Sequence, residues 1–209
     1  MGWLVRPLVR DDLVRLLSAW RLWILATFAG AVLAAGVYFL APPPYRARAT
    51  VLVDFNLEQA RPAETDRQHF YYLERETRKL EEIAWSDSVM LAVANGDAAQ
   101  VRGLREGRLQ LGQPGEGGWH FYADGTTAQA AASLASAWAE TFAGAAQARI
   151  AESGGLDSHI EVQVTQSAQV PVARSVPVGS YLLAGAGSAW FLAAFLFLFF
   201  GPTTRRAVA

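Results

Sequence analysis

Few side chains in the sequence have the type and spacing that metal or cofactor chemistry needs. The histidines are His69, His120 and His159, which stand far apart and outside any HExxH or histidine–cysteine pattern that holds zinc. The chain has no cysteine, so it offers neither a thiolate ligand nor a disulfide. We therefore expect no metal site and no bound cofactor.

Nucleotide chemistry needs a P-loop, in which a glycine-rich turn is followed by a lysine that reaches the β and γ phosphates. Lys79 is the only lysine, and it follows Arg78 inside an expected helix. The glycine-rich segment GQPGEGG at 112–118 has no lysine after it and is predicted to be a hairpin turn. We expect no ATP hydrolysis by this chain.

Hydrolytic chemistry has no better support. Seventeen carboxylates lie between Asp54 and Glu161, but no spacing marks two of them as a glycosidase pair, and no GxSxG elbow is present. The charged residues of segment 67–82 are expected to form a solvated helix face, with a contact between neighbouring subunits as the functional alternative. Tyr71 and Tyr72 are candidates for stacking on sugars, whereas Phe70 is assigned to the core. The sequence therefore predicts no catalytic residue.

Two long uncharged runs, at 22–41 and 176–200, frame the rest of the chain. At about 1.5 Å per helical residue, each can cross a hydrocarbon core of about 30 Å. A cleaved signal peptide fits residues 1–41 poorly, so both runs are predicted to be retained membrane helices. Small residues at four-residue spacing would let another helix approach closely: Ala26, Gly30 and Ala34 in the first run, Gly185 and Ala189 in the second.

The charge distribution predicts the topology. The two tails carry six arginines against Asp11 and Asp12, whereas residues 42–174 carry 17 acidic and 12 basic side chains, a charge near −5. The positive-inside rule then places both tails in the cytoplasm and exports the middle, although Arg46, Arg48 and Arg174 lie near the outer ends of the spans. An acidic exported part also excludes a nucleic-acid partner.

The predicted organisation has five parts. Residues 1–21 form an amphipathic segment that lies on membrane lipid. A transmembrane helix at 22–41, an extracytoplasmic domain at 42–175, a second transmembrane helix at 176–200 and a cytoplasmic tail at 201–209 follow. The expected location is the cell membrane, crossed twice.

Hydrophobic periodicity predicts the elements of the middle domain. Apolar alternation indicates a strand over 47–55 and another over 159–167, and a hairpin is expected over 108–123. A loop at 56–64 precedes an amphipathic helix from Thr65, whose expected core stripe is Phe70, Leu73, Thr77, Leu80 and Ala84. A short helix ends near Ala94, and an alanine-rich helix runs to about Glu152. The fold class is α+β, with a small mixed sheet between the two membrane helices.

Four local patterns carry a family resemblance. They are PPPYRARATVLVDF at 42–55, EEIAWSDSVMLAVA at 81–94, GTTAQAAASLASAWAETF at 125–142 and SAQVPVARSVPV at 167–178. Together they resemble the polysaccharide co-polymerases, the Wzz-type chain-length determinants. The middle domain is short for that family and has no room for its very long helical arm. Only Pro171 and Pro177 stand where a fuller proline series is common, and there is no kinase domain.

The resemblance implies a non-catalytic scaffold of the inner membrane that assembles into a homo-oligomeric ring. Such a scaffold regulates the length or the export of a surface polysaccharide, with a polysaccharide polymerase and the growing glycan as partners. We expect the structural and assembly determinants to be Ala26, Gly30, Ala34, Pro171, Pro177, Gly185 and Ala189. Three alternatives are an adaptor for a separate tyrosine kinase, an accessory subunit of an unrelated complex such as an energy-transducing one, and a membrane enzyme.

Overall fold

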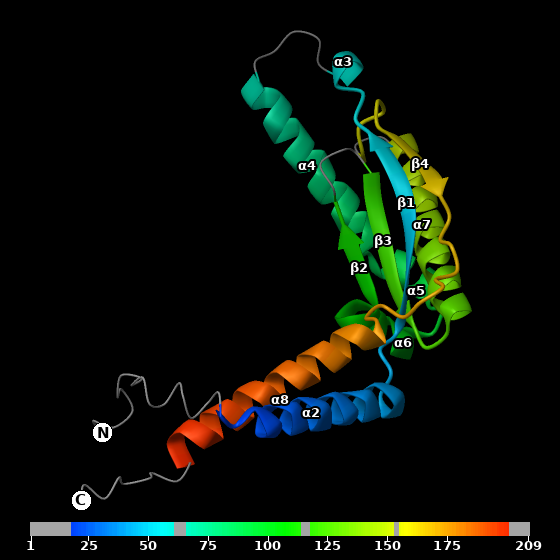
Figure 1. The fold of residues 1–209 in the computed structure, drawn as a ribbon. Helices are drawn as coiled ribbons and strands as arrows, with labels where there is room; N and C mark the ends of the chain where they lie inside the picture. Colours follow the sequence, from blue (N-terminus) through cyan, green and yellow to red (C-terminus); the bar gives the residue numbers. More distant parts are fainter. Residues whose placement is uncertain (1–17, 61–65, 114–117, 153–154, 201–209) are drawn as a thin grey trace, which may run out of the picture. The chain divides into compact units, whose positions relative to one another are not determined.

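The computed structural model describes residues 18–60, 66–113, 118–152 and 155–200 (Figure 1). The chain forms two compact units, one of Met1–Pro43 with Val176–Ala209 and one of Pro44–Ser175. The first contains two long apolar helices, and the second contains helices and one sheet. The predicted α+β class, with a helix suitable for a membrane span near each end of the chain, is confirmed.

The two apolar helices, α2 (Trp20–Leu40) and α8 (Val178–Phe200), lie side by side along their length (Figure 1). Ring contacts join opposite ends of the two sequences: Trp23 lies 5.7 Å from Phe197, and Tyr38 lies 5.3 Å from Tyr181. The start of α2 therefore meets the end of α8, so the helices form an antiparallel pair. Their mean hydropathies of 2.0 and 1.6, with their lengths, suit a bilayer crossing.

The sheet has four strands in the order β2-β3-β1-β4, with β1 at Tyr45–Asp54, β2 at Leu109–Gly112, β3 at Gly118–Gly125 and β4 at Glu161–Gln166. Every pairing is antiparallel, so the prediction of a mixed sheet is wrong. The chain does place β2 parallel to β1 in direction, but the hairpin partner β3 lies between them. The two parallel strands therefore never share hydrogen bonds.

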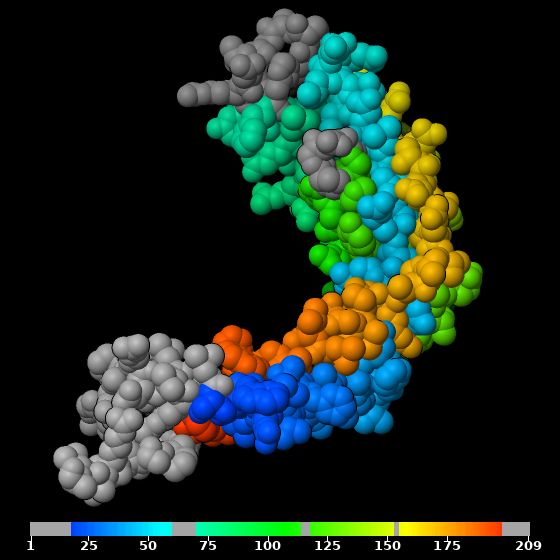
Figure 2. Space-filling view, viewed as in Figure 1, coloured from blue at the N-terminus to red at the C-terminus, as the bar shows by residue number. Residues whose placement is uncertain are grey.

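Alternation along β1 decides which face of the sheet is covered. Ala47, Ala49, Val51 and Val53 are buried beneath α7 (Ala128–Ala151), as the predicted strand and alanine-rich helix require. Thr127 caps α7 by accepting a hydrogen bond from the backbone N–H of Ala130. On the opposite face of the sheet, no helix among the described residues covers the central strands, which lie at the surface in Figure 2.

Large aromatic rings fill the space between α7 and the sheet. The ring of Phe121 lies 4.8 Å from that of Trp138 and 5.0 Å from that of Phe142, and all three side chains are fully buried. The Trp138 Nε1–H donates to the carbonyl oxygen of Ala84 at 3.0 Å, which ties α7 to the end of another helix. The hydrogen bond thus fixes the Trp138 ring, whose large apolar area is buried in the core.

The remaining helices are α3 (Leu57–Ala60), α4 (Asp66–Ala84), α5 (Asp87–Val93) and α6 (Ala98–Gly103), followed by a π-helical turn, η1 (Leu104–Arg108). The predicted loop at 56–64 contains α3, which is a correction, and its last residues lie outside the described part. Sequence periodicity did not predict α6 or η1. Ser86 caps α5, and the helix is followed by Asn95 and Gly96 at φ 51° and 83°.

Candidate functional site

The small residues predicted to mediate close helix approach lie between α2 and α8 of the same chain. A Cβ added at Gly30 would overlap the Gly185 carbonyl oxygen and the Ala189 Cβ, and one added at Gly185 would overlap the Ala34 Cβ and the Gly30 carbonyl oxygen. Ala26 lies half-buried on the same face of α2. The close approach is therefore satisfied inside the chain, and the role of these residues in assembly stays a prediction.

The outward surface of the helix pair is large and apolar. Leu33 is 72% exposed and Leu183 is 77% exposed, and Gly36 and Gly187 would each meet no atom within 4 Å if a Cβ were added. A core helix of a soluble protein buries such side chains, whereas an apolar surface of this extent needs lipid or another protein over it.

The predicted proline determinants lie between β4 and α8. Pro171 is half-buried in a segment without regular secondary structure. The Pro177 carbonyl accepts a hydrogen bond from the Ser180 N–H at 3.0 Å, at the start of α8. Nearby in sequence, the Arg174 guanidinium lies 4.7 Å above the Tyr45 ring. Arg174, one of the positive charges that departed from the positive-inside pattern, therefore stacks on the first strand of the domain.

The open face of the sheet is largely polar, and its side chains lie in rows that run across the strands. Strand pairing places Arg46 opposite Asp124, Arg48 opposite Tyr122, and Thr50 opposite His120. Gln110 of β2 lies on the other side of Tyr122. At the far end of β1, Asp54 pairs with Glu161 of β4. The face is therefore basic and aromatic at one end and acidic at the other.

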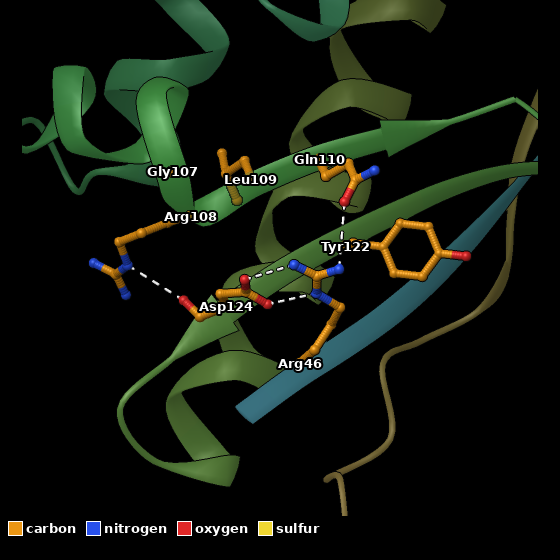
Figure 3. A pocket seen from close by; sticks show the side chains of 7 residues that line it. All are labelled: Arg46, Gly107, Arg108, Leu109, Gln110, Tyr122 and Asp124. Atoms are coloured by element: carbon orange, nitrogen blue, oxygen red, sulfur yellow. Dashed lines mark hydrogen bonds and ion pairs between the residues drawn. The ribbon is translucent and has the colours of Figure 1, made fainter. Parts of the chain in front are cut away.

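The basic end contains a hollow of about 240 Å³, which we name the arginine pocket (Figure 3). It is lined by Arg46, Gly107, Arg108, Leu109, Gln110, Tyr122 and Asp124. The Arg46 guanidinium donates to both oxygens of Asp124 at 2.7 and 2.8 Å and to the Gln110 side-chain oxygen at 3.4 Å. Arg108 Nε donates to the Asp124 backbone oxygen at 3.3 Å, as Figure 3 shows. Asp124 thus holds two arginines at one side of the pocket.

Electrostatics distinguish the arginines of this face. The bidentate bond to Asp124 raises the pKa of Arg46 above its usual value and neutralises its charge locally. Within the described residues, neither Arg48 nor Arg108 forms an ion pair with a carboxylate. Burial, with the nearby Arg48 as a second cause, lowers the pKa of His120. The basic end of the face therefore carries two positive charges without a carboxylate partner.

The ring of Tyr122 is positioned by the strand beside it. At Gly112 of β2 an added Cβ would stand 3.2 Å from the Tyr122 ring, so a side chain there would require the ring to shift by a few tenths of an ångström. The His120 ring lies 6.0 Å from that of Tyr122, edge to face. The glycine thus leaves the space in which Tyr122 rests, and the ring stays half-exposed beside the arginine pocket.

The core stripe predicted for helix α4 is right at its C-terminal end, where Leu80 and Ala84 are fully buried, and wrong at its start. Phe70 is 64% exposed instead of lying in the core, and Tyr72, a candidate for sugar stacking, is 5% exposed. Glu76, counted among the solvated charges, is fully buried and accepts hydrogen bonds from Arg75 Nε and Lys79 Nζ at 2.8 and 2.9 Å. Burial, and secondarily Asp157, raises the pKa of Tyr72 to about 12. The buried stripe runs through positions 72, 76 and 80.

No group of three potential metal-ligating side chains is found among the described residues. His120 lies 3.3 Å from the Thr50 hydroxyl, and His159 is exposed on its loop. The side chain of His69 lies outside the described part. The histidines therefore do not converge in the part of the chain that the structure describes.

The sequence reasoning missed the arginine pocket. The sequence does contain a signal for it, because the polar positions of two alternating segments share one face. These positions are Arg46 and Arg48 in the first segment, and His120, Tyr122 and Asp124 in the second. Alternation shows that these residues share a face, but only the strand register shows which of them meet.

The fold thus defines a class of protein in which two apolar helices, paired with each other, bracket an α+β domain with one open sheet face. The family model described as Wzz, chain length determinant protein, matches residues 11–96, from before α2 to just after α5. Over those residues the resemblance drawn from the sequence is confirmed, and it supports a role in determining polysaccharide chain length. No protein with a curated description matches the chain.

Proposed function

We propose that this protein is a non-catalytic scaffold of the inner membrane that assembles with copies of itself and regulates the length or export of a surface polysaccharide. The match of residues 11–96 to the chain-length determinants is the observation that carries the proposal. Proteins of that family are generally non-catalytic. The exposed apolar surface of the helix pair supports a place in the bilayer.

The proposed topology has both tails in the cytoplasm and Pro44–Ser175 outside. The arginines of the two tails support it by the positive-inside rule. Three arginines near the outer ends of the spans are the exceptions. Two of them have roles in the folded domain, because Arg46 pairs with Asp124 and Arg174 stacks on Tyr45. These two arginines therefore have a structural role in the domain, so their position near the membrane is a weaker objection to its export.

The helix pair suggests how the proposed assembly is arranged. Gly30 and Gly185 face each other within one chain. Their role in the proposal is therefore to hold α2 and α8 together as an antiparallel pair. Contacts between copies then come from the outward side of the pair or from the domain. The growing glycan and its polymerase are the partners in this proposal, which the family match supports.

Two measurements test the proposed function. The first is the mass of the intact particle in mild detergent, for which a self-assembled ring predicts a homogeneous multiple of the 22.7 kDa chain. The second is the length distribution of surface polysaccharide in cells without the protein, which should lose its preferred length. A stoichiometric complex with redox subunits, or with a tyrosine kinase, together with an unchanged polysaccharide distribution would overturn the proposal.

A further inference from the structure

Residues 168–175, which we name the exit segment, lead from the domain towards α8 and carry its most exposed apolar side chain. Val172 is fully exposed and Val170 is 50% exposed, whereas no other large apolar residue described in Pro44–Ser175 is more than 67% exposed. Apolar area is unfavourable in water. A single exposed apolar side chain is nevertheless ordinary on a protein surface, so the surroundings decide what these two valines mean.

The exposure of these valines is built into the fold, because both ends of the exit segment are anchored. At its start, the Ala168 N–H donates to Ser136 Oγ of α7 at 3.0 Å. At its end, the Ser175 N–H donates to the Pro44 carbonyl at 2.9 Å. Pro171 between the two valines is half-buried, and its ring fixes its own φ. The segment therefore holds the valines away from the core.

The same anchors place the exit segment where the chain leaves the domain. Pro44 follows the last residue of α2 by four residues, and Ser175 precedes the first residue of α8 by three. Because Pro44 and Ser175 are hydrogen-bonded, both exits of the chain lie at one point of the domain. Val172 stands six residues before α8, so the length of the chain keeps it within about 22 Å of the start of that helix.

The charge of the sequence near both exits suits a lipid surface. Glu161 is the last carboxylate of the chain, and no carboxylate lies between Asp12 and Asp54. The acidic side chains of the domain therefore stand apart in sequence from both exits, where lipid phosphates would repel them. Contacts between proteins are enriched in tyrosine, tryptophan and arginine, and the exit segment contains only Arg174 of these. Its composition thus favours lipid over a second protein.

We propose that Val170 and Val172 insert into the interface of the lipid bilayer and dock the domain on it. The partner is the boundary between the headgroups and the acyl chains, where apolar side chains of surface-bound segments are buried. The proposal rests on the proposed function at one point, a helix pair that crosses the bilayer. A second copy of the chain is the other cover that the test must separate.

The experiment measures the accessibility of a spin label at Val172→Cys, with the full chain in nanodiscs of phosphatidylcholine. The chain has no cysteine, so the label attaches at one site. Power saturation compares oxygen, which concentrates in lipid, with a nickel chelate, which stays in water. We expect the ratio of oxygen to nickel accessibility to be severalfold higher at Val172 than at Leu52→Cys. Leu52 is the matched site, because it is 40% exposed on the same domain and lies about 23 Å along β1 from Tyr45.

Further variants separate the effect of the valines from that of the covalent link to α8. The label is moved to the exposed Ala173, as Ala173→Cys, and the double variant Val170→Ser with Val172→Ser removes both apolar side chains. We expect the accessibility ratio at Ala173 to fall severalfold in the double variant, because serine gains nothing from leaving water. The control Leu52→Ser removes an exposed apolar side chain elsewhere on the domain and should leave the ratio unchanged. Hydrogen exchange of β1 and β3 shows that each variant is folded.

Three results would overturn the inference. A label at Val172 that nickel reaches as freely as the label at Leu52 lies in water. A label that neither agent reaches is covered by protein, which would be a second copy of the chain. An unchanged ratio at Ala173 in the double variant would mean that the covalent link alone keeps the segment at the bilayer.

Labels at Leu33→Cys and Leu183→Cys, on the exposed surface of the helix pair, keep the proposed function separate from the inference. If nickel reaches both of these labels, the helix pair is not in the bilayer, and the proposed function fails together with the inference. If nickel reaches neither of them but does reach Val172, the inference alone fails.

Discussion

The helix pair and the α+β domain both depend on small residues, but they use them in opposite ways. Between α2 and α8, Gly30 and Gly185 bring two backbones into contact, and no large side chain fits there. Between α7 and the sheet, alanines such as Ala135 and Ala139 alternate with Trp138 and Phe142, which fill the space that the alanines leave. The pair is therefore sensitive to added atoms, and the domain is sensitive to lost atoms.

This difference follows from the surroundings of each region. In water, the burial of apolar area is favourable, so burying large aromatic rings stabilises the domain. Lipid gives no such drive, so two helices in it gain by close van der Waals contact, which small residues permit. The same alanine and glycine content thus has two physical meanings in one chain.

Removing a large ring from the domain should have the largest effect. Trp138→Ala leaves a cavity beneath β3 and an unpaired carbonyl at Ala84, and we expect a loss of about 3 to 5 kcal/mol in the free energy of unfolding of the domain. Denaturant-dependent hydrogen exchange of the β1 and β3 amides in the full chain measures it. Trp138→Phe, which keeps a ring but loses the hydrogen bond, should cost less than Trp138→Ala. A loss below 1 kcal/mol would show that the core does not depend on this ring.

Adding atoms to the helix pair should have the next largest effect. Gly30→Leu would drive its side chain into the backbone of Gly185, and we expect a cost of about 1 to 3 kcal/mol to helix pairing. Because the chain has no cysteine, spin labels attached through Leu33→Cys and Leu183→Cys report the distance between α2 and α8.

The matched control for the pair is Gly36→Leu, which places the same side chain on the outward surface of α2, where nothing lies within 4 Å. We expect the spin-label distance to broaden in Gly30→Leu and to stay narrow in Gly36→Leu. If both variants behave alike, the glycine contact is not what closes the pair. If only the control lowers the particle mass, the outward surface is the contact between copies.

Much of the fold could be predicted, because hydrophobic periodicity is local. The uncharged runs gave α2 and α8, alternation at Ala47–Val53 gave β1, and the alanine-rich stripe gave α7. The hairpin of β2 and β3 followed from two short apolar segments about a glycine-rich turn. Each of these signals lies within one element, so no tertiary contact is needed to interpret it.

The candidate site could not be predicted in the same way, because it depends on contacts between distant elements. The apolar spacing along α4 predicts that Phe70 lies in the core and says nothing in favour of burying Glu76. Glu76 is buried because Arg75 and Lys79 donate hydrogen bonds to its carboxylate. The small-residue spacing predicts that another helix approaches Gly30, but only the tertiary structure identifies that helix as α8 of the same chain. The arginine pocket required the register of three strands, which decides that Arg46 meets Asp124 and Gln110.

A smaller effect is expected at the buried Tyr72, at the edge of the domain core. Its hydroxyl has no hydrogen-bond partner among the described residues, so Tyr72→Phe should change stability at pH 7 by less than about 1 kcal/mol. The pKa of Tyr72 is raised to about 12, above the usual value near 10. The folded state therefore holds this proton more tightly than the unfolded chain, and stability falls as the pH rises from about 10 to about 12.

Denaturation at pH 8 and pH 11 measures this difference. The unchanged chain should lose more stability between the two than Tyr72→Phe does, whereas Tyr71→Phe, at a tyrosine that is 67% exposed, should behave like the unchanged chain. Equal losses in all three would show that the Tyr72 phenol is not held in a buried environment.

The smallest expected effect concerns His120, on the open face that the core does not use. Burial, and secondarily the charge of Arg48, lowers its pKa from the usual value near 6.5. Arg48→Gln should raise the pKa of His120 only partway, because burial is the larger cause and remains. Titration of the ring signals by NMR measures it, and Arg78→Gln on α4 is the control for a change in overall charge. An unchanged pKa of His120 in Arg48→Gln would mean that the charge of Arg48 does not act on this ring and that burial alone lowers the pKa.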